Sequence, residues 1–128
     1  MRQLRIGLAQ INSTVGDLEG NVEKLKSYLL EAEQQGVDLL CFPELAITGY
    51  PPEDLLLKPA FIRDNLLALE EFAKFTKGKD ITVVVGFVDR QEDLYNAAAV
   101  IYQGEIKGIH HKVYLPNYGV FDEERYFK

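Results

Sequence analysis

The chain has 128 residues, of which 47% are hydrophobic and 27% are charged, and its formal net charge is −6. These values are typical of one globular domain or part of one, and the negative charge argues against a nucleic-acid-binding or polybasic membrane-binding protein. No apolar run approaches the roughly 20 residues of a membrane helix, and the first residues lack the apolar centre of a signal peptide. A single cysteine excludes an internal disulfide, so we expect a cytoplasmic protein.

Two predicted strands with a helix between them open the chain. Residues 4–10 alternate apolar with small or polar side chains, which predicts a strand. Apolar residues then recur at helical spacing, with Asn21 as the expected N-cap and Gly36 at the end; they are Val22, Leu25, Leu29 and Ala32. The apolar run 37–42 predicts a buried strand. Because a helix connects them, we expect the two strands to be parallel.

A turn-rich segment leads into a second helix. Residues 48–52 combine glycine and proline, the strongest chain breakers. Glu53 and Asp54 are expected to begin a short helical turn that Pro59 stops, since acidic residues suit a helix N-terminus. The second helix is predicted from apolar residues at helical spacing and ends near Gly78; they are Ile62, Leu66, Leu69, Phe72 and Ala73.

Three further strands are predicted after the second helix. The β-branched run 81–88 reads as an interior strand. Residues 95–102 and 105–112 face each other across Gln103 and Gly104, a short hairpin signal. A purely parallel doubly wound fold would need a helix where this hairpin stands. The sequence therefore predicts an α/β fold with a mixed sheet.

Glu44 is the first candidate functional residue. It follows the buried strand directly after Pro43, which cannot donate to a sheet ladder. Residues 45–47 are apolar, so the carboxylate is expected in mostly apolar surroundings, where it is a candidate for proton transfer. Ligands of α/β sheets also gather at the carboxyl ends of strands. The alternative is a surface glutamate at a strand-to-loop corner.

Lys112, at the end of the predicted hairpin, is the second candidate. A lysine in such a place is most often a solvated cation with a buried aliphatic stem. The alternative is a cation held beside Glu44, where each charge offsets the cost of removing the other from water.

Other candidates for catalysis or metal binding are excluded on their sequence context. Cys41 and Glu44 have opposite parity along a strand, so we expect their side chains to start on opposite faces; a lone cysteine in an apolar strand is usually a small hydrophobic residue. His110 and His111 are neighbours on a predicted strand and point apart, and no cysteine or acidic residue has ligand spacing to them. We therefore expect neither a nucleophile nor a metal site from these residues.

Longer motifs resemble a known family. FPELAITGYPPEDLLLKPAF (42–61), HKVYLPNYGVFDEERYF (111–127) and GLAQINSTVGDLEGN (7–21) resemble the glutaminase domains of glutamine-dependent NAD+ synthetases, within the nitrilase or carbon–nitrogen hydrolase superfamily. The resemblance extends over essentially all of residues 1–128. It implies that the chain forms the N-terminal half of a nitrilase-like α-β-β-α sandwich with a mixed sheet.

The resemblance also implies a role for individual residues. Glu44 matches the general base of the family's Glu-Lys-Cys triad, and Lys112 matches the cation that stabilises the tetrahedral intermediate. The family's nucleophile is a cysteine well C-terminal of the lysine motif, and Cys41 does not match it. Tyr50, Tyr118 and Phe121 match aromatic residues that line the family's glutamine pocket. Glu123 matches a supporting acidic residue near the triad.

Amide hydrolysis through a thioester needs a thiolate, a base and a positive partner for the oxyanion. The resemblance implies a parent enzyme that hydrolyses glutamine and passes ammonia to a synthetase domain, where ATP and magnesium convert deamido-NAD to NAD+. It also implies homo-oligomers. For residues 1–128 alone we expect no cofactor, no metal and no glutaminase activity. Two alternatives stay open: part of another nitrilase-superfamily amidase, and a non-catalytic α/β binding module.

Overall fold

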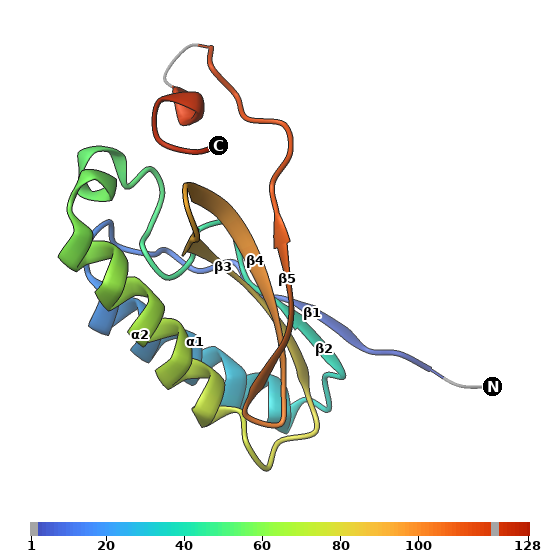
Figure 1. Cartoon of the computed structure of the whole chain (residues 1–128). Helices are drawn as coiled ribbons and strands as arrows, with labels where there is room; N and C mark the ends of the chain where they lie inside the picture. Colours follow the sequence, from blue (N-terminus) through green and yellow to red (C-terminus); the bar gives the residue numbers. More distant parts are fainter. Residues whose placement is uncertain (1–2, 119–120) are drawn as a thin grey trace.

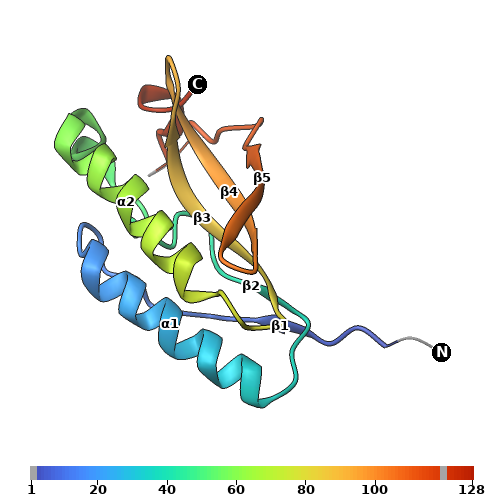
Figure 2. The ribbon, with the colours of Figure 1, turned by 60° about the horizontal axis from the view of Figure 1, so that its bottom comes forward.

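The computed structural model describes residues 3–118 and 121–128, which form one five-stranded sheet with two helices packed on one of its faces (Figures 1 and 2). The strands, which lie in the sheet in chain order, are β1 (Ile6–Leu8), β2 (Leu39–Cys41), β3 (Thr82–Arg90), β4 (Leu94–Tyr102) and β5 (Glu105–His111). The helices are α1 (Leu18–Gln34) and α2 (Pro59–Phe75), with short 3-10 turns at η1 (Glu53–Leu57) and η2 (Glu123–Arg125). Gly119 and Val120, in the aromatic tail, lie outside the described residues.

The sheet is mixed, as the sequence predicts. β1, β2 and β3 run parallel, and the chain then turns back twice so that β3, β4 and β5 pair antiparallel. β1 and β2 are shorter than predicted, because only three residues of each strand join the sheet. The predicted run 81–88 instead extends to Arg90, where a tight turn leads into β4.

The start of α1 differs from the prediction. The N-cap is Asp17, whose carboxylate accepts a hydrogen bond from a backbone N–H of the first turn (3.0 Å). Asn21 is instead a fully buried helix residue, and its amide group donates to the carbonyl oxygens of Thr14 (2.8 Å) and Ile47 (2.9 Å). Aspartate and asparagine cap helices equally well. The asparagine is used here to tie the loop before α1 to the segment that follows Glu44.

The main hydrophobic core lies between the helices and the sheet. Leu25 and Leu29 of α1, Phe72 of α2, and Val83 and Val85 of β3 are almost completely buried there. Burying each of these side chains stabilises the fold by about 1.5–3 kcal/mol. Their positions confirm the helical and strand periodicities read from the sequence.

The opposite face of the sheet is much more open. Figures 1 and 2 show no helix over it, and Ile6 and Leu8 of β1 are 54% and 76% exposed. The described residues thus form one helix layer and one sheet layer of the expected α-β-β-α sandwich. Neither helix in this described part of the chain combines the length and hydropathy of a membrane-spanning segment.

A second, smaller cluster anchors the C-terminal tail. Phe127 is buried against Leu45 and Val88, and the backbone N–H of Lys128 donates to the carbonyl oxygen of Leu94 (2.9 Å). The tail therefore lies against the beginning of β4 and the loop that follows β2, which is where Glu44 is found.

Candidate active site

Glu44 is carried by a loop that crosses β3. The backbone N–H of Ile47 donates to the carbonyl oxygen of Gly86 (3.1 Å), which fixes the loop on the strand. A Cβ atom at Gly86 would lie 2.3 Å from the nitrogen of Leu45 and 2.7 Å from the carbonyl oxygen of Pro43, both backbone atoms. Only glycine permits this approach. The loop therefore sets the carboxylate against the open face of the sheet at the carboxyl end of β2.

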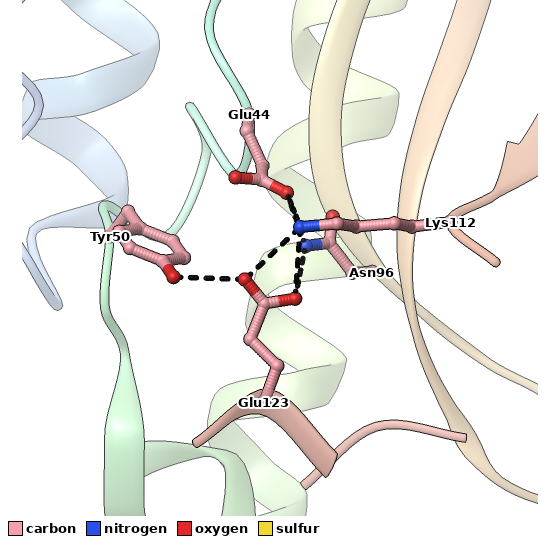
Figure 3. Close-up of polar contacts among 5 residues, drawn as sticks. All are labelled: Glu44, Tyr50, Asn96, Lys112 and Glu123. Carbon is pink, nitrogen blue, oxygen red and sulfur yellow. Dashed lines mark hydrogen bonds and ion pairs between the residues drawn. The ribbon is translucent and has the colours of Figure 1, made fainter. Parts of the chain in front are cut away.

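Glu44 and Lys112 meet although they are 68 positions apart (Figure 3). The Lys112 Nζ donates to Glu44 Oε1 at 2.5 Å, and the two side chains are 30% and 42% exposed respectively. The expectation of apolar surroundings for Glu44 is wrong for its carboxylate. Residues 45–47 are buried as expected, but the glutamate side chain turns out of that core toward the cavity.

Glu123 is the buried carboxylate of the site, with a side chain only 5% exposed. Its two oxygens accept hydrogen bonds from Lys112 Nζ at 3.2 and 3.1 Å, and the Tyr50 hydroxyl donates to Oε1 at 2.9 Å. A buried carboxylate is tolerated when it is paired and hydrogen-bonded. Lys112 thus bridges two carboxylates, and this charged group keeps one net negative charge.

The pKa values of Lys112 and Tyr50, which both donate to Glu123, are raised in the site. Partial burial alone would lower the pKa of Lys112, but its hydrogen bonds to Glu44 and Glu123 and their negative charges outweigh this and raise it. Burial raises the pKa of the Tyr50 phenol above its ordinary 10.0, and the hydrogen bond to Glu123 and the two carboxylate charges raise it further. Both groups are therefore protonated donors throughout the neutral range.

Asn96, on β4, also belongs to the site. Its amide Nδ2 donates to Glu44 Oε1 at 2.8 Å and to Glu123 Oε2 at 3.4 Å. The sequence reading missed this residue. The available signal is a polar side chain inside the otherwise apolar strand YNAAAVIY, which a single sequence cannot distinguish from an exposed position.

The three aromatic residues predicted for a pocket lie in a row beside the charged group. The ring centroids of Tyr50 and Phe121 are 6.4 Å apart, and those of Phe121 and Tyr118 are 5.7 Å apart in an edge-on arrangement. Tyr118 is 69% exposed. Tyr50, Phe121 and Glu123 line a cavity of about 260 Å³. A larger cavity of about 530 Å³ on the open face of the sheet is lined by Glu44, Asn96 and Lys112 among others.

Cys41 does not line the larger cavity within the described part of the chain. Strand alternation does not separate Cys41 from Glu44, however. β2 ends at Cys41 and Pro43 turns the chain, so strand parity cannot be extended as far as Glu44.

The two histidines have separate environments. His111 Nε2 lies 2.7 Å from Asp89 Oδ2, and its ring stacks on Tyr95 with 4.0 Å between centroids. His110 lines the larger cavity. His111 therefore has an acidic partner that spacing along the chain did not indicate. Residues 3–118 and 121–128 contain no group of three or more side chains suited to hold a metal ion.

The arrangement supplies a base and a cation on the same side of one cavity. The Glu44 carboxylate can accept a proton, and the Lys112 ammonium can stabilise a developing negative charge nearby. Neither group is a suitable nucleophile toward an amide here, because one is ion-paired and the other is protonated.

Comparison with known proteins agrees with this geometry. The model of a family described as Carbon-nitrogen hydrolase matches residues 5–128. The glutamine-dependent NAD(+) synthetase of Thermotoga maritima is 56% identical over 128 residues, which are 100% of this chain and 22% of that protein.

Two solved structures extend the comparison. The glutamine-dependent NAD+ synthetase of Acinetobacter baumannii, in complex with adenosine diphosphate, superimposes with a TM-score of 0.86 at 40% identity over 98% of this chain and 24% of that one. A mutant of an amidase of the nitrilase superfamily from Nesterenkonia shares the fold, with a TM-score of 0.85 at 24% identity over 98% of this chain and 47% of that one. The chain thus spans about a fifth to a quarter of the two synthetases.

Proposed function

The chain belongs to the carbon–nitrogen hydrolase family, and we propose that it forms the N-terminal part of a glutaminase domain in a glutamine-dependent NAD+ synthetase. The observation that carries this proposal is the contact between Glu44 and Lys112, 2.5 Å apart at the carboxyl end of β2. The similarity to two synthetases over essentially the whole chain supports the choice of glutamine among possible amides.

In the proposed reaction Glu44 acts as the general base. It takes the proton of an attacking thiol and gives it to the departing ammonia as the thioester forms. It then takes a proton from the water that hydrolyses the thioester and returns it to the thiol as glutamate leaves. Lys112 stabilises the oxyanion of each tetrahedral intermediate, and Glu123 keeps the ammonium in place. The thiol comes from a cysteine outside residues 1–128, since Cys41 is the chain's single cysteine and does not line the cavity of Glu44.

We propose that this row of aromatic residues contacts the bound glutamine. Tyr50, Tyr118 and Phe121 form an apolar wall beside the charged cluster, on which the aliphatic part of glutamine can pack. Tyr50 has a second task, because its hydroxyl is already engaged by Glu123. It therefore supports the site as well as lining it.

The remaining partners follow from the same proposal. Ammonia released from glutamine reaches a synthetase domain outside residues 1–128, where ATP and magnesium convert deamido-NAD to NAD+ in a cytoplasmic homo-oligomer. Residues 1–128 by themselves take no metal or cofactor and release no ammonia from glutamine.

The proposal is tested by ammonia release from the complete gene product. We expect hydrolysis of L-glutamine in the wild type and a loss of about 100- to 10,000-fold in kcat for Glu44→Gln, the range that a general base contributes. Glu92→Gln, at an exposed glutamate on the β3–β4 turn, is the matched control and keeps full activity. Residues 1–128 alone are assayed in parallel and remain at the blank.

Three results would contradict the proposal. Hydrolysis of simple aliphatic amides in place of glutamine would identify a different amidase of the same family. Full activity of Glu44→Gln would remove the glutamate from the mechanism, and activity of residues 1–128 alone would show that no outside thiol is needed.

A further inference from the structure

Asn96 touches all three charged residues of the site. Its side-chain Nδ2 reaches Glu44 Oε1 (2.8 Å) and Glu123 Oε2 (3.4 Å). Its backbone carbonyl oxygen accepts the backbone N–H of Lys112 at 2.8 Å. No other side chain in the described residues donates to both carboxylates except Lys112 itself.

The environment fixes the orientation of this amide. Ionised carboxylates only accept hydrogen bonds, so the NH2 end of Asn96 must face both of them. The residue is 4% exposed and sits within β4, opposite Val88 of β3 in the sheet register. An amide held by paired strands on a rigid scaffold can hold two carboxylates at a constant separation, which a lysine with four rotatable bonds cannot do alone.

The contacts also distinguish the two oxygens of Glu44. Lys112 and Asn96 both donate to Oε1, whereas the second carboxylate oxygen points away from both donors (Figure 3). Two donors already occupy the oxygen that they share. The second oxygen keeps its lone pairs for a proton from a bound reactant.

We propose that Asn96 is a positioning residue, which holds Glu44 and Glu123 around Lys112 and leaves Glu44 Oε2 as the oxygen that accepts the proton. The structural half of this proposal concerns residues 1–128 alone. The catalytic half rests on the proposed function.

The structural half is tested on the complete gene product by measuring the pKa of Lys112 from the NMR signal of its ammonium group. The Asn96→Ala substitution removes the amide that Glu44 and Glu123 share and frees the exposed Glu44 carboxylate to turn toward water, so we expect the raised pKa of Lys112 to fall toward 10.5. Asn96→Ser is a second variant, because its shorter hydroxyl cannot reach both carboxylates. The control is Thr76→Val. Thr76 is a buried residue at the end of α2, beside the turn that follows β4, and its hydroxyl makes hydrogen bonds with Ala73 and Gly104. Its loss should leave the pKa of Lys112 unchanged. An unchanged pKa in folded Asn96→Ala or Asn96→Ser would overturn the proposal.

The catalytic half is tested in the complete gene product with Asn96→Ala and Asn96→Asp. Misplacement of a catalytic group by about 1 Å can cost about 100-fold, so we expect kcat to fall by about 10- to 100-fold in Asn96→Ala with little change in KM. Asn96→Asp keeps the shape but turns a donor into a third carboxylate, and we expect a larger loss than in Asn96→Ala. A packing role predicts the reverse order, because the isosteric change leaves no cavity.

The outcomes separate the two proposals. Better activity of Asn96→Asp than of Asn96→Ala would overturn the positioning role. A rise in KM at constant kcat would overturn it as well, because it would make Asn96 a substrate-binding residue. Absence of glutamine hydrolysis in the wild type would overturn the proposed function instead, and the pKa of Lys112 would still decide whether Asn96 holds the charged cluster.

Discussion

At the scale of single residues, the site depends on one ammonium shared by two carboxylates. Lys112 Nζ lies 2.5 Å from Glu44 Oε1 and 3.1 Å from Glu123 Oε2. Only Glu123 is buried, so the two carboxylates depend on the lysine to different degrees. Water can replace the lysine at Glu44, whereas Glu123 would keep only neutral donors.

Removal of Lys112 should therefore destabilise the chain through Glu123. We expect Lys112→Met to lower the free energy of unfolding by about 3 kcal/mol, the cost of leaving a buried charge without its partner. Glu123→Gln in the same chain should restore much of this loss, which a double-mutant cycle by urea unfolding measures. Lys107→Met is the control, since its ion pair with Glu105 is exposed and its loss should change the free energy of unfolding far less. Equal effects of the two lysine substitutions would contradict the prediction.

Tyr50 should make the stability of the fold dependent on alkaline pH. Its folded-state pKa lies above the ordinary 10.0 because of burial and Glu123, so its stabilising contribution is complete below that pH and is lost as the pH rises above it. We expect the free energy of unfolding to fall more between about pH 8 and about pH 11 in the wild type than in Tyr50→Phe. Tyr114→Phe, at a residue that is 88% exposed, should behave like the wild type. The same pH dependence in all three chains would show that the hydroxyl of Tyr50 makes no such contribution.

At the scale of elements, the approach of the Glu44 loop to β3 sets the position of the base. Gly86 has no side chain, and backbone atoms of the loop occupy the space that a Cβ would need. Leu45, the next residue after the glutamate, is fully buried at a positive φ of 48°. Such a backbone conformation is unfavourable for leucine, and it persists because the surrounding structure holds it.

A methyl group at Gly86 should therefore displace the loop. We expect Gly86→Ala to destabilise the chain by about 3 kcal/mol, as overpacking does, and to lower kcat of the complete gene product by about 100-fold through displacement of Glu44. Gly108→Ala on β5 is the matched control, since a Cβ there meets nothing within 4 Å. Chemical denaturation and ammonia release measure the two effects. Normal activity in a folded Gly86→Ala chain would show that the close approach is not needed.

Several elements could be predicted from the sequence because their signals are local. The apolar periodicity of α1 and the hairpin turn at Gln103 and Gly104 depend on neighbouring residues, and both are present. The contacts of Asn96 and Gly86 depend instead on residues about 40 to 50 positions away. Nothing in the immediate neighbourhood of either residue indicates which loop will lie above it. The pairing of Glu44 with Lys112 is one alternative for an isolated lysine, and only the family motifs favour it over a solvated cation.

At the scale of the whole molecule, the sheet is unequally covered. One face carries α1 and α2, whereas the other presents Ile6 and Leu8 at 54% and 76% exposure. Exposed neighbouring apolar side chains of this kind mark surfaces that pack against protein. The cavity of Glu44 and Lys112 opens on the same face, so the surface that needs covering also carries the proposed chemistry.

Residues 1–128 in isolation should associate through this face. We expect them to elute as particles larger than a monomer in size-exclusion chromatography and to bind a hydrophobic dye. Leu8→Lys should reduce both effects, because it places a charge among the exposed apolar side chains of β1. Leu67→Lys, at an exposed position on α2, serves as the control and should change neither. A monomer that binds no dye would show that the open face is compatible with water.

The wide spacing of the charged group along the chain has a consequence for protein synthesis. Glu44 and Lys112 are 68 positions apart, and Tyr50 and Glu123 are 73 apart. Because a polypeptide leaves the ribosome N-terminus first, Glu44 emerges before Lys112, whose ammonium pairs with it. A nascent chain that stops before β5 therefore carries Glu44 without the ammonium of Lys112. The order of translation therefore delays the charged group until the segment after β5, which carries Lys112 and Glu123, has been synthesised.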